Sequence, residues 1–326
     1  MIDARYLDRK GLADGSAGLV TGLRTAAVAC IAALGAGIAL LYTARTYRLT
    51  RRGQITERFT KALERLDSEQ QYVRIGGILA LEQIVQDAPE QVATDAARVL
   101  GHFIRDRVPK AVPTPSSPAV GNEPLLPDPR SLPEEPAADV QAALTALTRE
   151  ESRTHVDDRE TLDLHGLHLA GAQLVHADLT RANLDGAKLT NADLRGATLA
   201  DAHLRGATLT NTNLYLATLT NADLDAATLT NANLHRATLT GANLAGATLA
   251  NANLDGATLS HANLYGATLT NAHLRRATLI NAYLYGATLT NADLYGATLT
   301  NADLHGATLT NAALHGADLS GVRGLA

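Results

Sequence analysis

A leucine recurs at every fifth residue from Leu164 to Leu319, which gives 32 positions without a gap. Two places before each leucine stands an alanine at 29 of the 30 positions from Ala172 to Ala317, and Thr212 is the exception. A period of five fits neither the 3.6-residue turn of an α-helix nor the two-residue alternation of a β-strand. A fixed period over so long a stretch indicates a solenoid, in which each short segment sends two residues inward and three outward.

The composition excludes several classes of site. The 326 residues include nine Tyr, two Phe and no Trp, fewer bulky aromatics than most globular cores use. With one Cys, the chain can form neither an internal disulfide nor a Cys-based zinc or iron–sulfur centre. The net charge of −5 is too balanced to predict direct nucleic-acid binding. The repeat holds nine His, but none is spaced with a carboxylate as a metal or acid–base site, so we expect no enzyme, no catalytic residue, no metal and no cofactor.

The repeat unit is recognisable in segments such as Ala192–Gly196 (ADLRG) and Ala292–Gly296 (ADLYG). These segments resemble the A(D/N)LXX unit of the pentapeptide-repeat family over about half of the chain. The resemblance implies a mainly β fold, a right-handed quadrilateral β-helix with four pentapeptides per coil. The 32 units would form about eight coils, and a rod of roughly 38 Å at about 4.8 Å per coil.

The leucines and the preceding alanines are expected to fill the axis of this rod. Burying one leucine side chain contributes roughly 1.5–3 kcal/mol, and each coil is stable only when stacked on a neighbour. The core positions that we single out are Leu184, Leu194, Leu204, Leu224, Leu244, Leu264, Leu284 and Leu304.

With four pentapeptides per coil, every fourth unit stacks in the same outward column, and every second unit lies on the opposite wall. Two columns of threonine, from Thr198 to Thr298 and from Thr208 to Thr308, suit a β wall, and Asn211 and its equivalents fall at a corner. The variable columns form the candidate interaction surface, since exposed Tyr and Arg are favoured at protein interfaces. Its residues are Arg195, Tyr215, His235, Tyr265, Arg275, Tyr285, Tyr295, His305 and His315. The alternative is that these residues form a solvated charge ladder and merely stack.

The outward columns suggest two other functions. Some pentapeptide-repeat proteins imitate duplex DNA and bind DNA gyrase, so an inhibitor or protector of gyrase is the alternative function. That mimicry relies on an acidic rod, whereas residues 161–326 hold 11 Asp against 8 Lys and Arg. The Thr-Leu-Thr rows also resemble ice-binding surfaces, but ladder stacking explains two opposite threonine walls better.

The N-terminal part has a different character. After a tail (1–24), the 19 residues 25–43 carry no charge and predict one transmembrane helix, with a signal peptide or a buried soluble helix as alternatives. Arg45, Arg48, Arg51 and Arg52 crowd its C-terminal flank, so the positive-inside rule predicts that the C-terminal part is cytoplasmic in a single-pass protein of the cell membrane.

A helical module (44–108), a Pro-rich linker (109–136) and a capping helix with its lead-in (137–160) are expected before the repeat (161–326). The segments GQITERFTKALERL and VRIGGILALEQI resemble those of actinobacterial membrane-anchored pentapeptide-repeat proteins. This organisation predicts a membrane-anchored, non-enzymatic scaffold that presents its solenoid to an unknown protein partner. Because the last coil has little to cap it, we also expect a homodimer through the C-terminal coil.

Overall fold

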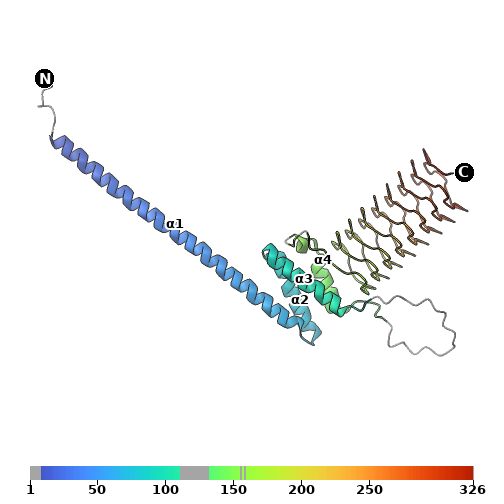
Figure 1. The fold of residues 1–326 in the computed structure, drawn as a ribbon, viewed down its shortest axis with the longest axis horizontal. Helices are drawn as coiled ribbons and strands as arrows, with labels where there is room; N and C mark the ends of the chain where they lie inside the picture. The colour runs from blue at the N-terminus through green and yellow to red at the C-terminus, as the bar shows by residue number, and fades with distance from the viewer. Residues whose placement is uncertain (1–8, 111–131, 155, 158, 326) are drawn as a thin grey trace, which may run out of the picture. The chain divides into compact units, whose positions relative to one another are not determined.

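In the computed structural model, the described residues are 9–110, 132–154, 156–157 and 159–325, and the chain divides into two units, Met1–Arg58 and Phe59–Ala326. Residues 1–8 of the predicted tail and 111–131 of the predicted linker lie outside the described residues. Five helices precede the repeat (Figure 1): α1 (Arg9–Leu66), α2 (Gln71–Asp87), α3 (Glu90–Arg107), α4 (Ala138–Thr148) and α5 (Glu150–Arg153).

Helix α1 is 58 residues long and continues through residue 43, where we expected the membrane segment to end and a separate module to begin. No proline interrupts residues 44–66, and the apolar spacing of Ile55, Phe59 and Leu63 continues the helical pattern. From Gly22 on, within the described residues, this helix is long and apolar enough to cross a membrane by length and composition. Its large apolar side chains, including Ile31, Leu34 and Leu41, are exposed.

Helices α2, α3 and α4 pack around one small core. Ile78, Leu81, Leu100, Ile104 and Leu144 are fully buried in it. The last turns of α1 join this core, because Ala62 is fully buried and a Cβ placed on Gly77 would lie 2.9 Å from the Ala62 carbonyl oxygen. Gly77 therefore allows the two helices to approach closely, while the neighbouring Gly76 faces open space.

A buried ion pair joins α2 to α4. The Arg74 guanidinium donates through Nε to Asp139 Oδ2 at 2.6 Å, and through Nη1 to the carbonyl oxygens of Ser68 and Glu69. Both side chains are almost fully buried. Because an unpaired buried charge is costly, this contact fixes how the two helices meet.

The repeat forms a rod of stacked coils, each made of four pentapeptides (Figure 1). Parallel bridges link equivalent positions of successive coils, and along one wall they run in eight steps from Asp163↔Asn183 to Asp303↔Arg323, as expected. Along the rod, a leucine N–H donates to the carbonyl oxygen of the residue just before the equivalent leucine of the next coil, as from Leu244 to Asn263 at 2.7 Å. The described walls carry isolated bridges rather than extended strands, because a turn follows within each five-residue wall.

As far as Leu304 along the rod, the two inward positions of each pentapeptide form the core. All eight of the leucines singled out above have no exposed surface, and the alanines between them are equally buried. Thr212, the one departure from alanine, is also fully buried, and its hydroxyl donates to the Leu189 carbonyl oxygen at 2.7 Å. A buried hydroxyl is tolerated in this core because it has an acceptor.

An asparagine ladder closes one corner of the rod. Each Asn side-chain amide donates to the Asn amide oxygen of the preceding coil at 3.1–3.2 Å, from Asn211 and Asn191 to Asn311 and Asn291. The backbone at these residues lies in the left-handed region, with φ of 56–59°. Asparagine tolerates this conformation better than most side chains, which explains its repetition at the corner.

Replacing one inward residue should therefore damage the rod far more than replacing its outward neighbour. We expect Leu244→Asp to lower the free energy of unfolding by at least about 4 kcal/mol, because it removes a buried leucine and buries a carboxylate. Ala245→Asp is the matched control, since the stacked residue one coil earlier is already Asp225. That variant should change stability by less than about 0.5 kcal/mol. Urea unfolding of the full chain in detergent, followed by circular dichroism, measures both, and equal destabilisation would contradict the assignment.

Candidate interaction surfaces

The structure divides the nine candidate residues between two opposite walls. Residues four pentapeptides apart stack on one another, and residues two pentapeptides apart stand half a coil away. The first column holds Arg195, Tyr215, His235, Arg275, Tyr295 and His315, and the second column holds Tyr265, Tyr285 and His305. The nine residues therefore form two surfaces, and one flat partner surface cannot contact both.

The aromatic side chains of each column stack along the rod. Ring centroids lie 5.6 Å apart in the pairs Tyr215–His235, Tyr265–Tyr285 and Tyr295–His315. The stacking that we considered as an alternative is thus present. It leaves the rings accessible, because Tyr265 and Tyr285 remain 58% and 52% exposed. Each stacked pair is a rigid aromatic surface that loses little conformational entropy on binding.

The arginines of the columns are bonded to neighbouring carboxylates. Arg195 Nη2 lies 2.7 Å from Asp193 Oδ2, and Arg275 Nε donates to Asp293 Oδ2 at 2.6 Å. Slight burial raises the pKa of Asp293, but the hydrogen bond and charge of Arg275 outweigh it and hold that pKa below its usual value. These contacts make part of each column the charge ladder that we considered as an alternative.

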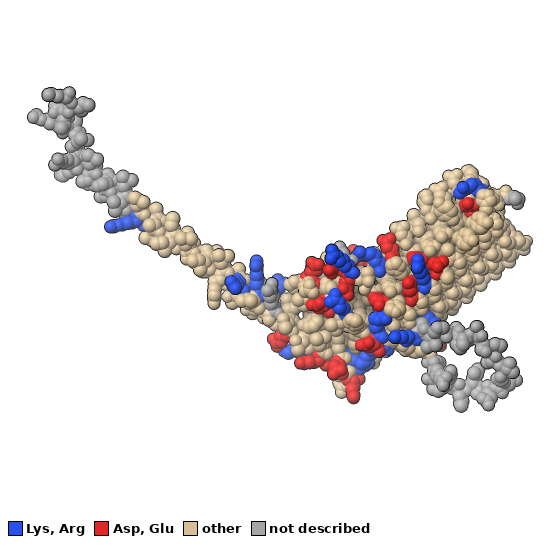
Figure 2. Space-filling view, in the orientation of Figure 1, with Lys and Arg blue, Asp and Glu red and all other residues tan. Residues whose placement is uncertain are grey.

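The histidine of the second column is similarly engaged. His305 Nδ1 lies 2.6 Å from Asp303 Oδ1, and hydrogen bonds from the His305 ring and backbone lower the pKa of Asp303. Figure 2 shows most charged side chains gathered over the helices and the first coils, while much of the rod farther along is uncharged on this face. The rod therefore presents paired charges between neutral stretches.

Bulky side chains replace glycine at one corner, two residues after the leucine. This corner reads His176, Gly196, Leu216, Arg236, Gly256, Arg276, Gly296 and Gly316 along the rod. Its four non-glycine residues have φ of 54–59°, a conformation that costs an L-residue about 1–2 kcal/mol. The sequence analysis did not single them out. The sequence signal that could have identified them is an arginine or leucine where the equivalent residue of other coils is glycine.

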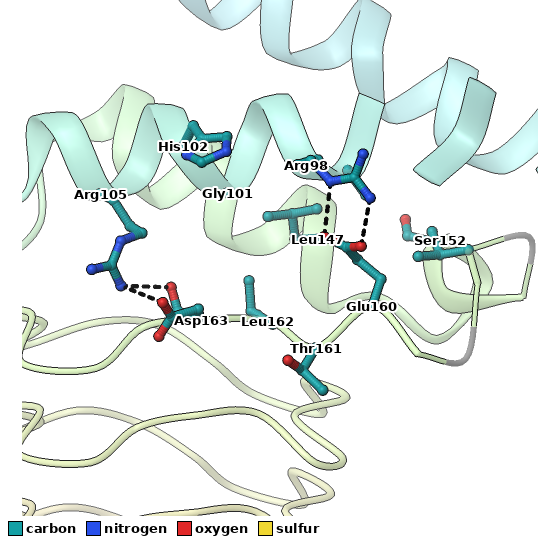
Figure 3. A pocket seen from close by; sticks show the side chains of 12 residues that line it. Arg98, Gly101, His102, Arg105, Leu147, Ser152, Glu160, Thr161, Leu162 and Asp163 are labelled. Atoms are coloured by element: carbon teal, nitrogen blue, oxygen red, sulfur yellow. Dashed lines mark hydrogen bonds and ion pairs between the residues drawn. The ribbon is translucent and has the colours of Figure 1, made fainter. Parts of the chain in front are cut away.

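A cavity of about 150 Å³ lies between α3 and the first coil (Figure 3). Two ion pairs cross from α3 to the coil: Arg98 donates to both oxygens of Glu160, and Arg105 Nη1 lies 2.8 Å from Asp163 Oδ2. Partial burial raises the pKa of Asp163, but hydrogen bonds from His165 and the charge of Arg105 outweigh it and lower that pKa. The pairs hold the helical module against the rod.

Further backbone contacts cover the first edge of the rod. Asp178 N–H donates to the Thr148 carbonyl oxygen at the end of α4, and Lys110 pairs with Leu167 in an antiparallel bridge. At the other end of the predicted linker, His168 Nε2 lies 2.8 Å from the Pro133 carbonyl oxygen. The described ends of the segment expected to be a linker thus lie on the first coil, because an open edge offers unpaired N–H and C=O groups.

Among the described residues, no group of three or more His, Cys, Asp and Glu is placed to hold a metal ion. The cavity is lined by a buried hydroxyl, Ser152 Oγ, that has no hydrogen-bond partner there. No nucleophile–base pair accompanies it among the described side chains that line the cavity.

Comparison with known proteins adds the following. A family model described as pentapeptide repeats matches eight copies, over residues 163–196, 197–236, 232–271, 259–296 and 289–323. No curated protein matches the chain.

Solved structures of similar proteins include HetL, a pentapeptide repeat protein involved in heterocyst differentiation regulation from the cyanobacterium Nostoc sp. strain PCC 7120. It is 33% identical over 49% of this chain and 88% of its own, with a TM-score of 0.28. Rfr23 from the cyanobacterium Cyanothece 51142 is 43% identical over 26% of this chain and 58% of its own, with a TM-score of 0.26. QnrB1, a plasmid-mediated fluoroquinolone resistance protein, is 22% identical over 48% of this chain and 83% of its own, with a TM-score of 0.33. Each of these TM-scores is below 0.5. The structural superpositions therefore carry less weight than the matched repeats and the 33% sequence identity to HetL.

Proposed function

The chain belongs to the pentapeptide-repeat family, and on this premise we propose that it is a membrane-anchored, non-enzymatic scaffold whose rod binds a protein partner in the cytoplasm. The observation that carries the proposal is the exposed, stacked Tyr265–Tyr285 pair on a rod whose axis is filled by leucine and alanine. Rigid exposed aromatic rings are typical anchors of protein interfaces. A filled axis leaves the outside of the rod for recognition.

The membrane anchor is supported by helix α1. A 19-residue uncharged stretch at residues 25–43 is near the length that spans about 30 Å of hydrocarbon. Its exposed apolar side chains need an apolar environment, which a bilayer supplies. Arg45 and Arg48 on its C-terminal flank favour a cytoplasmic rod.

No observation favours the alternative of a gyrase-binding DNA mimic. Such a mimic needs unpaired acidic side chains in series, whereas Asp193, Asp223 and Asp293 are each bonded to an arginine. The likeness to QnrB1 is below 25% identity and concerns the fold alone. The threonine columns likewise need no ice-binding role, because the threonines occupy the bridge positions that join the coils.

The last described coil supports a homodimer. Leu309, Leu314 and Leu319 are half-buried, whereas the leucines of the earlier coils are fully buried. Their N–H groups have no backbone acceptor among the described residues. A second copy that stacked its own last coil there would cover the leucines and pair these groups.

Light scattering of the full chain in detergent tests the dimer. We expect the mass of two chains after subtraction of the detergent, and we expect Leu314→Lys to halve it by placing a charge in the contact. The matched control is His315→Lys at the neighbouring exposed position, which should leave the dimer intact. A monomer at all concentrations would contradict the proposal.

Topology tests the anchor and its orientation. We expect a C-terminal reporter to remain in the membrane fraction, protected from protease in intact cells and cleaved in inverted membranes. Replacing Arg45, Arg48, Arg51 and Arg52 by Ser should weaken this orientation, because the basic flank sets it. Cleavage in intact cells would reverse the orientation, and release into the soluble fraction would refute the anchor.

The binding surface is tested one column at a time, because the two columns lie on opposite walls. Tyr265→Ser with Tyr285→Ser should weaken a cross-linked partner complex about 30-fold, since truncation of an aromatic anchor costs about 2 kcal/mol or more. Arg195→Ser with Tyr215→Ser, on the other wall, is the matched control. Both pairs are outward, so circular dichroism should show an unchanged rod. If neither pair alters what is cross-linked in membranes, the stacked rings are not the binding site.

A further inference from the structure

A cleft of about 720 Å³ lies along the first column, in the C-terminal half of the rod. Its sides include Arg236 and Arg276, and Gly256 lies between them on the intervening coil. A Cβ placed on Gly256 would lie 3.5 Å from Arg236 Cγ, so the Arg236 side chain lies over this glycine. The bases of the two side chains are two coils apart, about 10 Å at the usual spacing of neighbouring strands.

These two arginines are unlike the third arginine in the cleft. Arg275 donates through Nε to Asp293 and through its backbone N–H to Asp255 Oδ1, so its charge is neutralised within the rod. Arg236 and Arg276 have no side-chain hydrogen bond or ion pair with any described residue. Both are exposed, and they are therefore the guanidinium groups of this cleft that remain available to a ligand.

Arg236 and Arg276 also stand where the fold favours glycine. Their φ angles are 57° and 54°, and Gly196, Gly256 and Gly296 occupy the equivalent corner in other coils. An arginine in this conformation is disfavoured relative to glycine, and its exposed side chain adds nothing to the core. A pair of residues held against the local preference, with free charges facing one cleft, indicates a binding role.

We propose that this cleft binds an acidic segment of a partner protein, with Arg236 and Arg276 each taking up one carboxylate. The inference rests on the proposed function, in which the rod binds a protein, and it adds the chemistry of the bound segment. Guanidinium groups bind carboxylates through two parallel hydrogen bonds. In an extended peptide, acidic residues two apart lie on one face about 7 Å from each other, within reach of two long side chains based about 10 Å apart.

The acidic side chains of the cleft favour a peptide over a nucleic acid. Asp255 and Asp293 line the same cleft. Duplex DNA carries one phosphate charge about every 1.7 Å along its axis, so a nucleic-acid backbone would bring phosphates against these carboxylates. A peptide in which acidic residues alternate with neutral ones can place its charges at the arginines and neutral residues beside the aspartates.

The test is binding of a fluorescein-labelled (Glu-Ser)₄ peptide to the full chain in detergent micelles, followed by anisotropy at low salt. We expect saturable binding that weakens as salt is added, because exposed charges are screened. Arg236→Gly with Arg276→Gly should lower the affinity at least about tenfold, since it removes both charge-assisted contacts. The variant should melt no lower than the wild type, because glycine suits this corner.

The matched control is Arg181→Gly with Leu216→Gly, which relieves two left-handed residues and removes an exposed arginine from another corner. This control should keep the wild-type affinity. Equal affinity in the Arg236→Gly/Arg276→Gly variant, or an equal loss in the control, would overturn the proposal. Binding of a single-stranded oligonucleotide or of phosphatidylserine vesicles, without binding of the peptide, would overturn it in favour of that ligand. The assay needs neither the predicted topology nor the tyrosine columns, so it can fail while the proposed function stands, and the reverse.

Discussion

The hydrogen bond from each leucine N–H to the carbonyl oxygen just before the equivalent leucine of the next coil is the contact on which the rest of the rod depends. It is short, typically 2.7 Å, and recurs on every wall. Because it ties a residue to the neighbour of its equivalent in the next coil, it fixes the coil at four pentapeptides and keeps every leucine on the axis. The buried leucines and alanines then exclude water from these bonds, so hydrogen bonding and apolar burial support each other. Neither would hold a single coil, which explains why the segment after α3 and the end of α4 cover the first edge through Lys110 and Thr148.

Because every coil has the same length, equivalent residues of successive coils line up as columns on the surface of the rod. Whatever residue follows a leucine is repeated as a column, so stacked rings, bonded arginine–aspartate pairs and an asparagine ladder arise without any cleft having to be built. The corners limit this freedom, because their left-handed backbone favours glycine and asparagine. Side chains that depart from that preference, such as Arg236 and Arg276, lower the local stability of the rod.

The sequence predicted the fold more completely than it predicted the candidate sites. The inward positions follow from the period, whereas the coil of four pentapeptides, and with it the corner asparagines, was implied by the resemblance to the pentapeptide-repeat family. The aromatic columns on the two opposite walls could also be written down, but the sequence did not indicate which wall binds a partner. The continuous helix α1 was missed because an uncharged stretch shows where a bilayer can lie and not where a helix ends. The cleft was missed because Arg236 and Arg276 had to be compared with Gly256 on the coil between them.

The sequence by itself determined the rod, its eight coils, its filled axis and the family to which it belongs. It did so because the same inward leucine and alanine recur in successive pentapeptides. Tertiary structure alone decided which charges are free. Arg275 and Arg276 are neighbours in sequence, but one is bonded to Asp293 of the adjoining coil, and the other faces the cleft without a partner in the described chain. It also decided that α3 is tied to the first coil through Arg98 and Arg105. Such pairings depend on distances between side chains of different coils and helices, which a period in sequence does not specify.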